Sequence, residues 1–83
     1  MLGSPQVYRE GDFSYCIYYN EGAEPPHVHV VHGEGTAKFW LEPPCLEWNK
    51  GLKRGTLQRA RRQVEDRCLF FMEQWHATQD RKR

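Results

Sequence analysis

The 83-residue sequence predicts an α+β fold, in which an antiparallel sheet of about four strands is followed by one long C-terminal helix. Residues 7–48 contain short runs of β-branched and aromatic residues separated by turns rich in Gly and Pro, a pattern typical of strands. Residues 56–77 instead space their apolar residues three and four positions apart, which is typical of a helix with one buried face. A chain of this length forms one core, so we expect a single domain over residues 1–83, ending in a basic tail at 78–83.

The first two strands are expected at residues 7–9 and 13–19, joined by a turn that contains Gly11. Alternate residues of the second strand are large and apolar or aromatic, and they should share one face of the sheet. These residues are Phe13, Tyr15, Ile17 and Tyr19. Pro25 and Pro26 then favour an extended backbone leading into the next strand, and the sequence leaves their isomers open.

The central hairpin is expected to join residues 27–32 and 36–41 through the loop Gly33-Glu34. The expected cross-strand pairs are Val30 with Ala37, Val28 with Phe39, His29 with Lys38, and His27 with Trp40. One face of the hairpin is then wholly apolar, and both histidines, Lys38 and Trp40 lie together on the other. A slip of one residue would place His29 opposite Phe39 and mix the two faces, so we favour the two-residue loop.

After the hairpin, residues 45–48 leave open an additional short edge strand, and residues 49–51 indicate a turn. The helix follows, and Thr56 is a plausible N-cap for it. The buried stripe of that helix is expected to cover the sheet. Its members are Leu57, Ala60, Val64, Cys68, Phe71, Met72 and Trp75. Phe70 falls on the opposite side of the helix, where an aromatic ring has no core to enter, so it is a candidate contact for a partner.

Composition excludes several classes of protein. No apolar run approaches the roughly 20 residues of a membrane span, and the first residues lack the features of a signal peptide, so we expect a cytoplasmic protein with no membrane contact. The three cysteines are widely spaced without a C-x-x-C pair, which favours free thiols. No motif calls for a cofactor.

Charge is divided unevenly along the chain. Residues 1–49 carry a net charge of −5, whereas residues 50–83 carry +6. A basic half attracts RNA, DNA or an acidic protein, and it makes Arg59 and Arg62 candidate contacts for nucleic acid. A solvated helix with a basic end explains the same charges equally well.

Two motifs lie in order along the chain, separated by a Gly-containing turn: Glu24-Pro-Pro-His-Val-His-Val30 and Ala37-Lys-Phe-Trp-Leu-Glu-Pro43. With the aromatic strand before them and a terminal helix bearing Trp75, they make the chain resemble the bacterial domain-of-unknown-function family 4160 over nearly its whole length. Pro44-Cys45 and Trp48 look unusual for that family. The resemblance implies a small stand-alone protein encoded beside a partner gene, in a toxin–antitoxin-like pair. It implies no particular reaction.

The histidine face allows three interpretations. In the first, His27 or His29 is a general acid or base of a ribonuclease toxin, Lys38 stabilises phosphate charge, and Trp40 stacks on a base. In the second, the His-x-His pair binds a metal ion, with a third ligand from His32, Cys16 or Glu42. His32, however, belongs to the apolar face by alternation.

In the third interpretation the same face binds nucleic acid or a protein partner without chemistry. We favour this one: a nucleic-acid-binding or partner-binding component of a toxin–antitoxin-like module, without a metal or another cofactor. The working face is His27, His29, Lys38 and Trp40, helped by Arg59, Arg62 and Phe70. The sequence does not fix the oligomeric state.

Overall fold

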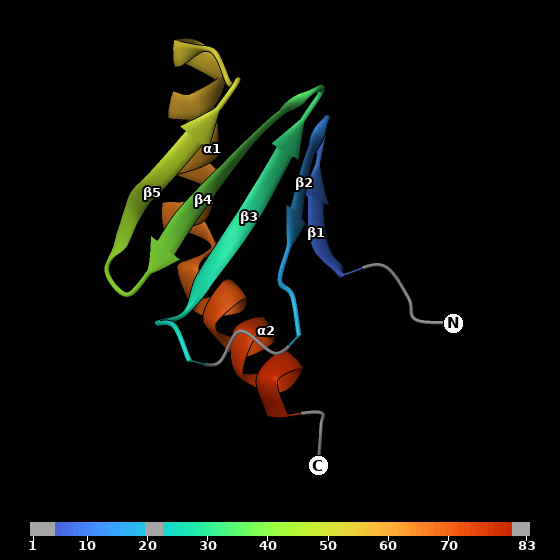
Figure 1. Cartoon of the computed structure of the whole chain (residues 1–83), viewed down its shortest axis with the longest axis vertical. Coiled ribbons are helices and arrows are strands. Elements are labelled where there is room, and N and C mark those ends of the chain that lie inside the picture. Colours follow the sequence, from blue (N-terminus) through green and yellow to red (C-terminus); the bar gives the residue numbers. More distant parts are fainter. Residues whose placement is uncertain (1–4, 20–22, 81–83) are drawn as a thin grey trace.

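The computed structural model describes residues 5–19 and 23–80 of the chain, as one antiparallel sheet with helices on one side of it (Figure 1). The five strands are neighbours in the order of the sequence. They are β1 (Gln6–Glu10), β2 (Phe13–Cys16), β3 (His27–His32), β4 (Gly35–Leu41) and β5 (Pro44–Lys50). The helices are α1 (Arg54–Asp66) and α2 (Cys68–Asp80). The predicted α+β class and antiparallel sheet are therefore confirmed.

Two of the predicted numbers were wrong. The sheet has five strands instead of about four, because β5 is a full seven-residue strand that pairs along β4. The helical region is two helices instead of one, because the backbone of Arg67 leaves helical geometry, with φ −115° and ψ 25°. The hydrogen bond from the Arg67 amide to the Gln63 carbonyl is kept, and so is that from the Phe71 amide to the Arg67 carbonyl.

The ends of the helical region also differ from the prediction. Helix α1 begins at Arg54, two residues before Thr56, and its N-cap residue Lys53 provides no side-chain hydrogen bond. Residues 78–80, predicted as the start of a basic tail, belong to α2. The rest of that predicted tail, residues 81–83, lies outside the described residues.

The predicted register of the central hairpin is confirmed. Its four expected pairs are present, and His32 pairs with Gly35 around the loop Gly33-Glu34. Gly33 has a φ of +59°, a left-handed conformation that glycine adopts without strain. As expected, Val28, Val30, Ala37 and Phe39 are fully buried.

The core lies between the helices and the face of the sheet that they cover, which we call the inner face. The helices contribute Ala60, Val64, Phe71 and Trp75, all buried. Tyr19 was expected on the inner face, but β2 ends at Cys16 and Tyr19 is 47% exposed. Within the described part of the chain, no helix is both long enough and apolar enough to cross a membrane.

The connection from β5 to α1 is held by one side chain. The Asn49 side chain accepts a hydrogen bond from the Leu52 amide and donates one to the Leu52 carbonyl, both at 3.0 Å. Gly35, at the start of β4, packs directly against Gly51 of this connection, because a Cβ atom on Gly35 would lie 2.7 Å from the Gly51 carbonyl carbon. The two glycines thus bring the start of β4 and the end of β5 close to the start of α1.

Candidate functional site

The sheet surface opposite the helices, which we call the outer face, brings four predicted site residues together. His27, His29, Lys38 and Trp40 lie on neighbouring positions of β3 and β4, because His29 pairs with Lys38 and His27 pairs with Trp40. The rings of His27 and His29 are 5.3 Å apart, and those of His27 and Trp40 are 5.7 Å apart. The cluster predicted from strand alternation is therefore present in the structure.

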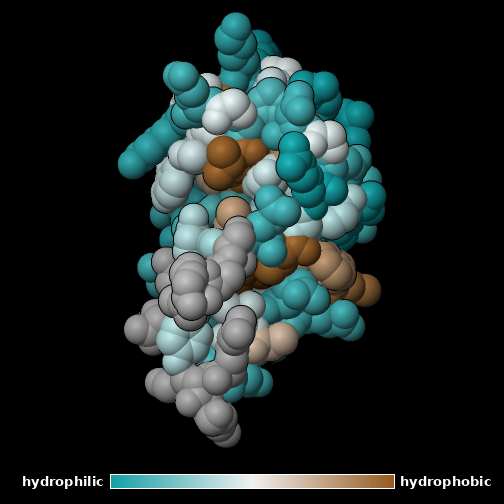
Figure 2. Space-filling view, turned by 90° about the vertical axis from the view of Figure 1, so that its right-hand side faces the viewer, coloured by the Kyte–Doolittle hydropathy of each residue, from teal (hydrophilic) through white to brown (hydrophobic). Residues whose placement is uncertain are grey.

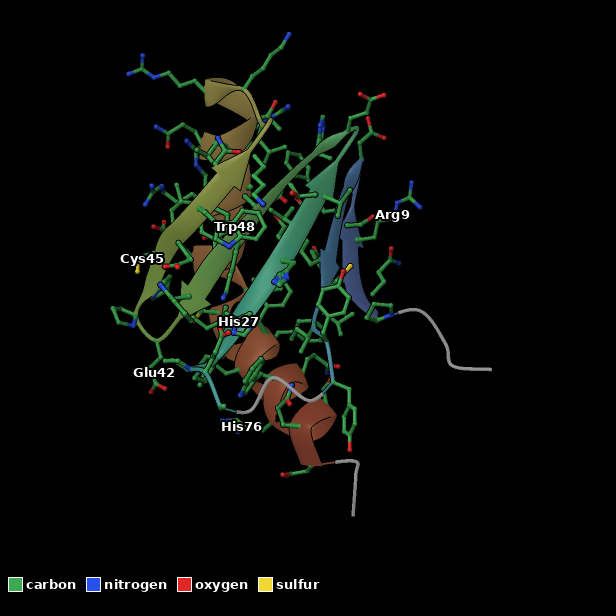
Figure 3. All side chains as sticks on the ribbon, viewed as in Figure 1. Arg9, His27, Glu42, Cys45, Trp48 and His76 are labelled. Atoms are coloured by element: carbon green, nitrogen blue, oxygen red, sulfur yellow. The ribbon has the colours of Figure 1, made fainter. Side chains whose placement is uncertain are left out.

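His27 differs from the prediction in one respect. We expected both histidines to point away from the core, but His27 is only 1% exposed. It is the first residue of β3, at the end of the sheet near α2, and its ring is 4.7 Å from that of Trp75 (Figure 3). Its Nδ1 donates a hydrogen bond of 2.9 Å to the Pro25 carbonyl. His27 thus links the outer face to the core instead of facing solvent.

A row of rings crosses the outer face from the end of β2 to β5. The ring of His29 is 5.0 Å from that of Tyr18 on one side and 5.9 Å from that of Trp48 on the other. Tyr18 is 41% exposed, and Trp48 is partly exposed and lies over the strands in Figure 3. This row presents aromatic surface to solvent on a sheet face that no described helix covers.

Lys38 lies among these rings and is held by Glu24. Its Nζ donates a hydrogen bond of 2.6 Å to a carboxylate oxygen of Glu24 and is 4.6 Å from the centre of the Trp40 ring, close enough for a cation–π contact. The Lys38 side chain is 11% exposed, whereas that of Glu24 is 48% exposed. The hydrogen bond from Lys38 lowers the pKa of the Glu24 carboxyl. The cation is thus fixed between a carboxylate and an aromatic ring.

Both tryptophans of the outer face have polar neighbours. The Trp40 Nε1 donates a hydrogen bond of 2.8 Å to a carboxylate oxygen of Glu47. The Lys50 Nζ lies 5.1 Å from the centre of the Trp48 ring. A carboxylate of β5 thus holds the Trp40 ring, and a lysine of β5 lies against the Trp48 ring.

Sequence reasoning missed Trp48 as part of this site. Simple alternation along β5 would place Trp48 on the same side as Leu46, toward the core. The pairing of β4 with β5 shifts between Lys38 and Phe39, so that Lys38 faces Trp48 while Phe39 faces Leu46. Glu47 is the extra residue of this bulge, and it returns Trp48 to the outer face. The one available clue was the unusual presence of tryptophan in this segment.

The described residues include no group of three or more His, Cys, Asp or Glu side chains arranged to hold a metal ion. His32, considered as a third ligand, packs its ring 4.6 Å from that of Phe13 in the core. Cys16 does pair with His29 across β2 and β3, and burial raises the pKa of its thiol. The structure thus brings one candidate thiol to the histidines but does not complete a ligand set among these residues.

The remaining predicted site residues lie elsewhere. Helix α1 packs on the inner face through Ala60 and Val64, so its solvent side faces away from the outer face. Arg59 and Arg62 are exposed there, and the Arg59 guanidinium lies 5.4 Å from the centre of the Phe13 ring. Phe70 is 37% exposed on α2, with its ring 5.9 Å from that of Tyr8. The structure therefore separates the histidine face from both the helix arginines and Phe70.

Comparison with known proteins identifies the family of the chain. Searches of curated proteins and of solved structures found no significant match to the chain. The family described as "Domain of unknown function (DUF4160)" matches residues 13–76, which include β2 to β5, α1 and most of α2. The matched region contains the histidine motif, all of α1 and most of α2, and the chain belongs to this family.

Proposed function

We propose that the outer face binds single-stranded nucleic acid by stacking bases on its exposed rings. The observation that carries the proposal is the row of Tyr18, His29 and Trp48 across an open antiparallel sheet, with Lys38 beside it. RNA-binding sheets commonly use exposed aromatic side chains for unpaired bases, because every base offers a π face. Lys38 is held by Glu24, so the phosphate contact falls to Lys50, which is exposed beside the Trp48 ring.

The geometry favours binding over cleavage by a pair of histidines. General acid–base catalysis needs both groups within hydrogen-bond reach of the substrate. His29 is partly exposed, but His27 is enclosed by Trp40, Trp75 and the Pro25 carbonyl. A two-histidine ribonuclease would therefore require His27 to leave its packed position. Incubation with labelled RNA checks this directly, and we expect the RNA to stay intact.

Trp48→Ala is the variant that tests the proposed face. Loss of one stacked base weakens binding by about 1 to 3 kcal/mol, so the affinity for a labelled single-stranded oligonucleotide should fall roughly fivefold or more. Trp48→Phe keeps an aromatic ring and should retain most of the affinity. Fluorescence anisotropy with RNA and DNA oligonucleotides measures both variants.

The matched control lies on the other side of the molecule. The double variant Arg59→Glu and Arg62→Glu changes the exposed charge of α1 without touching the outer face, so it should affect binding less than Trp48→Ala does. If Trp48→Ala leaves the affinity unchanged while the double variant abolishes binding, the nucleic-acid site is α1 and the proposed face is wrong. If wild-type protein binds neither RNA nor DNA at low salt, the proposal fails altogether.

From the family resemblance, we further propose that this binding serves a toxin–antitoxin-like pair in bacteria, with a cognate protein encoded nearby. Expression of the chain alone should then slow growth, and coexpression with the product of the neighbouring gene should restore it. Trp48→Ala should relieve the growth defect if nucleic-acid binding causes it. Normal growth at high expression of the wild-type chain would contradict this role.

A further inference from the structure

A second row of side chains runs beside the row of rings on the outer face. His29 and Trp48 belong to one set of cross-strand partners, and the residues two positions away on each strand, toward the top of Figure 1, form the next set. Since residues two positions apart on a strand point to the same face, this second row also lies on the outer face, about 7 Å from the first. We call it the polar row, and its members pair in succession from β1 to β5: Arg9, Ser14, Val31, Thr36 and Lys50.

The polar row has a cation at each end. Arg9 and Lys50 are exposed on the two edge strands, and neither forms an ion pair with any residue in the ranges 5–19 and 23–80. The Arg9 Nε donates a hydrogen bond of 3.2 Å to the Gly11 carbonyl, which carries no net charge. The partly exposed hydroxyl groups of Ser14 and Thr36 lie between the two cations. Side chains of all four of these types commonly donate hydrogen bonds to phosphate oxygens.

Two carboxylates of the outer face lie on the opposite side of the row of rings. Glu24 is held by Lys38, and its carboxylate oxygen is 3.8 Å from the His27 Nδ1. Glu47 accepts the hydrogen bond of Trp40. His27 and Trp40 form the next pair of the hairpin, on the side away from the polar row. A chain of phosphates is therefore repelled from one side of the rings and attracted to the other.

The carboxylates near the polar row do not cancel its charge. Asp12 and Glu34 lie in the turns beyond it, and neither forms an ion pair with the two cations of the row. Glu10 faces the helices, where it pairs with an arginine. Lys53 and Arg54 are exposed at the start of α1, at this same end of the sheet (Figure 1), so cations outnumber the carboxylates of the two turns there. Figure 2, which views the molecule from the side of β1, shows hydrophilic side chains over this end.

We propose that a nucleic-acid strand bound to the outer face crosses all five strands of the sheet, with its bases on the row of rings and its phosphates along the polar row. This inference rests on the proposed function, and it names the ligand as an oligonucleotide rather than a single nucleotide. Neighbouring strands of a sheet are about 4.8 Å apart, so the polar row is about 19 Å long. A stacked nucleic-acid strand has one phosphate about every 3.4 Å, so the row accommodates up to roughly six nucleotides.

Two oligonucleotides of the same base sequence test the path of the strand, one with ordinary phosphodiester linkages and one with uncharged methylphosphonate linkages. Arg9→Gln and Lys50→Gln should each weaken binding of the phosphodiester strand and reduce its slope of log affinity against log salt by about 0.7. The weakening should be similar for different base sequences. Binding of the methylphosphonate strand should stay unchanged in both variants, whereas Trp48→Ala should weaken binding of both strands. Fluorescence anisotropy at several salt concentrations measures all of these affinities.

Arg62→Gln is the matched control, because it removes one exposed cation from α1, on the other side of the sheet, and it should leave the slope unchanged. Arg9 and Lys50 are exposed, so their variants should melt like the wild type. If neither variant changes the slope while Trp48→Ala weakens both strands, the path is wrong and the proposed binding face stands. An equal loss of slope in Arg62→Gln would also overturn the path. If Trp48→Ala weakens neither strand, the proposed function itself fails and the path fails with it.

Discussion

Truncation of His27 is the sharpest test of how the outer face joins the core. In His27→Ala the imidazole is removed from a position that is 1% exposed, between the rings of Trp40 and Trp75. Its hydrogen bond to the Pro25 carbonyl is lost as well. Strand alternation alone would predict no change in stability, because it assigns His27 to a solvated face.

The expected loss has two parts. Truncation of a large buried side chain to alanine, with the cavity that it leaves, costs about 2 to 4 kcal/mol. The lost hydrogen bond adds about 1 kcal/mol. A domain of this size has a total stability of roughly 4 to 12 kcal/mol, so His27→Ala should remove a large share of it. The melting temperature should fall by more than about 10 °C.

Urea unfolding followed by circular dichroism measures this loss. His76→Ala is the matched control, because His76 is exposed on α2, and it should change stability by less than about 0.5 kcal/mol. His27→Phe keeps a ring but loses the Nδ1 donor, so its stability should lie between those of His27→Ala and the wild type. A loss below about 1 kcal/mol in His27→Ala would refute the packing described for His27.

Three further predictions concern the sheet, the core and the thiols. Gly35→Ala should cost more than about 2 kcal/mol because its Cβ would meet the Gly51 backbone, whereas Gly55→Ala has open space in the first turn of α1 and should stabilise by up to about 1 kcal/mol. Urea unfolding of the two variants checks both signs. Burial, and then the Glu10 carboxylate, raise the pKa of the Tyr15 phenol in the folded protein. The neutral phenol therefore contributes fully to the free energy of unfolding below about pH 10, and this contribution is lost as the pH rises toward the folded pKa. Tyr15→Phe should therefore flatten the alkaline fall in the free energy of unfolding. Cys45 is exposed and should react with iodoacetamide before Cys68, because burial raises the pKa of the Cys68 thiol; peptide mass spectrometry orders the two.

The hairpin at the centre of the sheet was predictable because its two strands carry opposite kinds of side chain on alternate positions. A slip by one residue would have exposed Phe39 and buried Lys38, so burial alone selects the register. The turn residues Gly33-Glu34 agreed with that choice. Where local turn chemistry and alternation agree, a single sequence suffices to place neighbouring side chains on one face.

The parts that were missed depend on contacts between segments far apart in the chain. Trp48 reaches the outer face through a bulge in β5, and alternation cannot anticipate an inserted residue. His27 keeps its predicted face but is buried by Trp75, which stands 48 positions later in the chain. The helix break at Arg67 coincides with its contacts to Tyr8 and Glu10 of β1. None of these partners can be read from the local pattern.

The uneven charge of the sequence becomes a division between two sides of the molecule, and this division predicts how salt should act on nucleic-acid binding. On the outer face, Glu24 pairs with Lys38 and Glu47 accepts the Trp40 hydrogen bond, so stacking rather than cation–phosphate contact should supply most of the affinity. Each phosphate contact adds about −0.7 to the slope of log affinity against log salt for single strands, so one or two contacts predict a shallow slope of roughly −1. Binding along the arginines of α1 would instead give a steep slope, which Arg59→Glu with Arg62→Glu would remove. Binding by the outer face therefore predicts two results together. The slope against salt should be shallow and should stay so in the Arg59→Glu, Arg62→Glu variant, and Trp48→Ala should lose affinity.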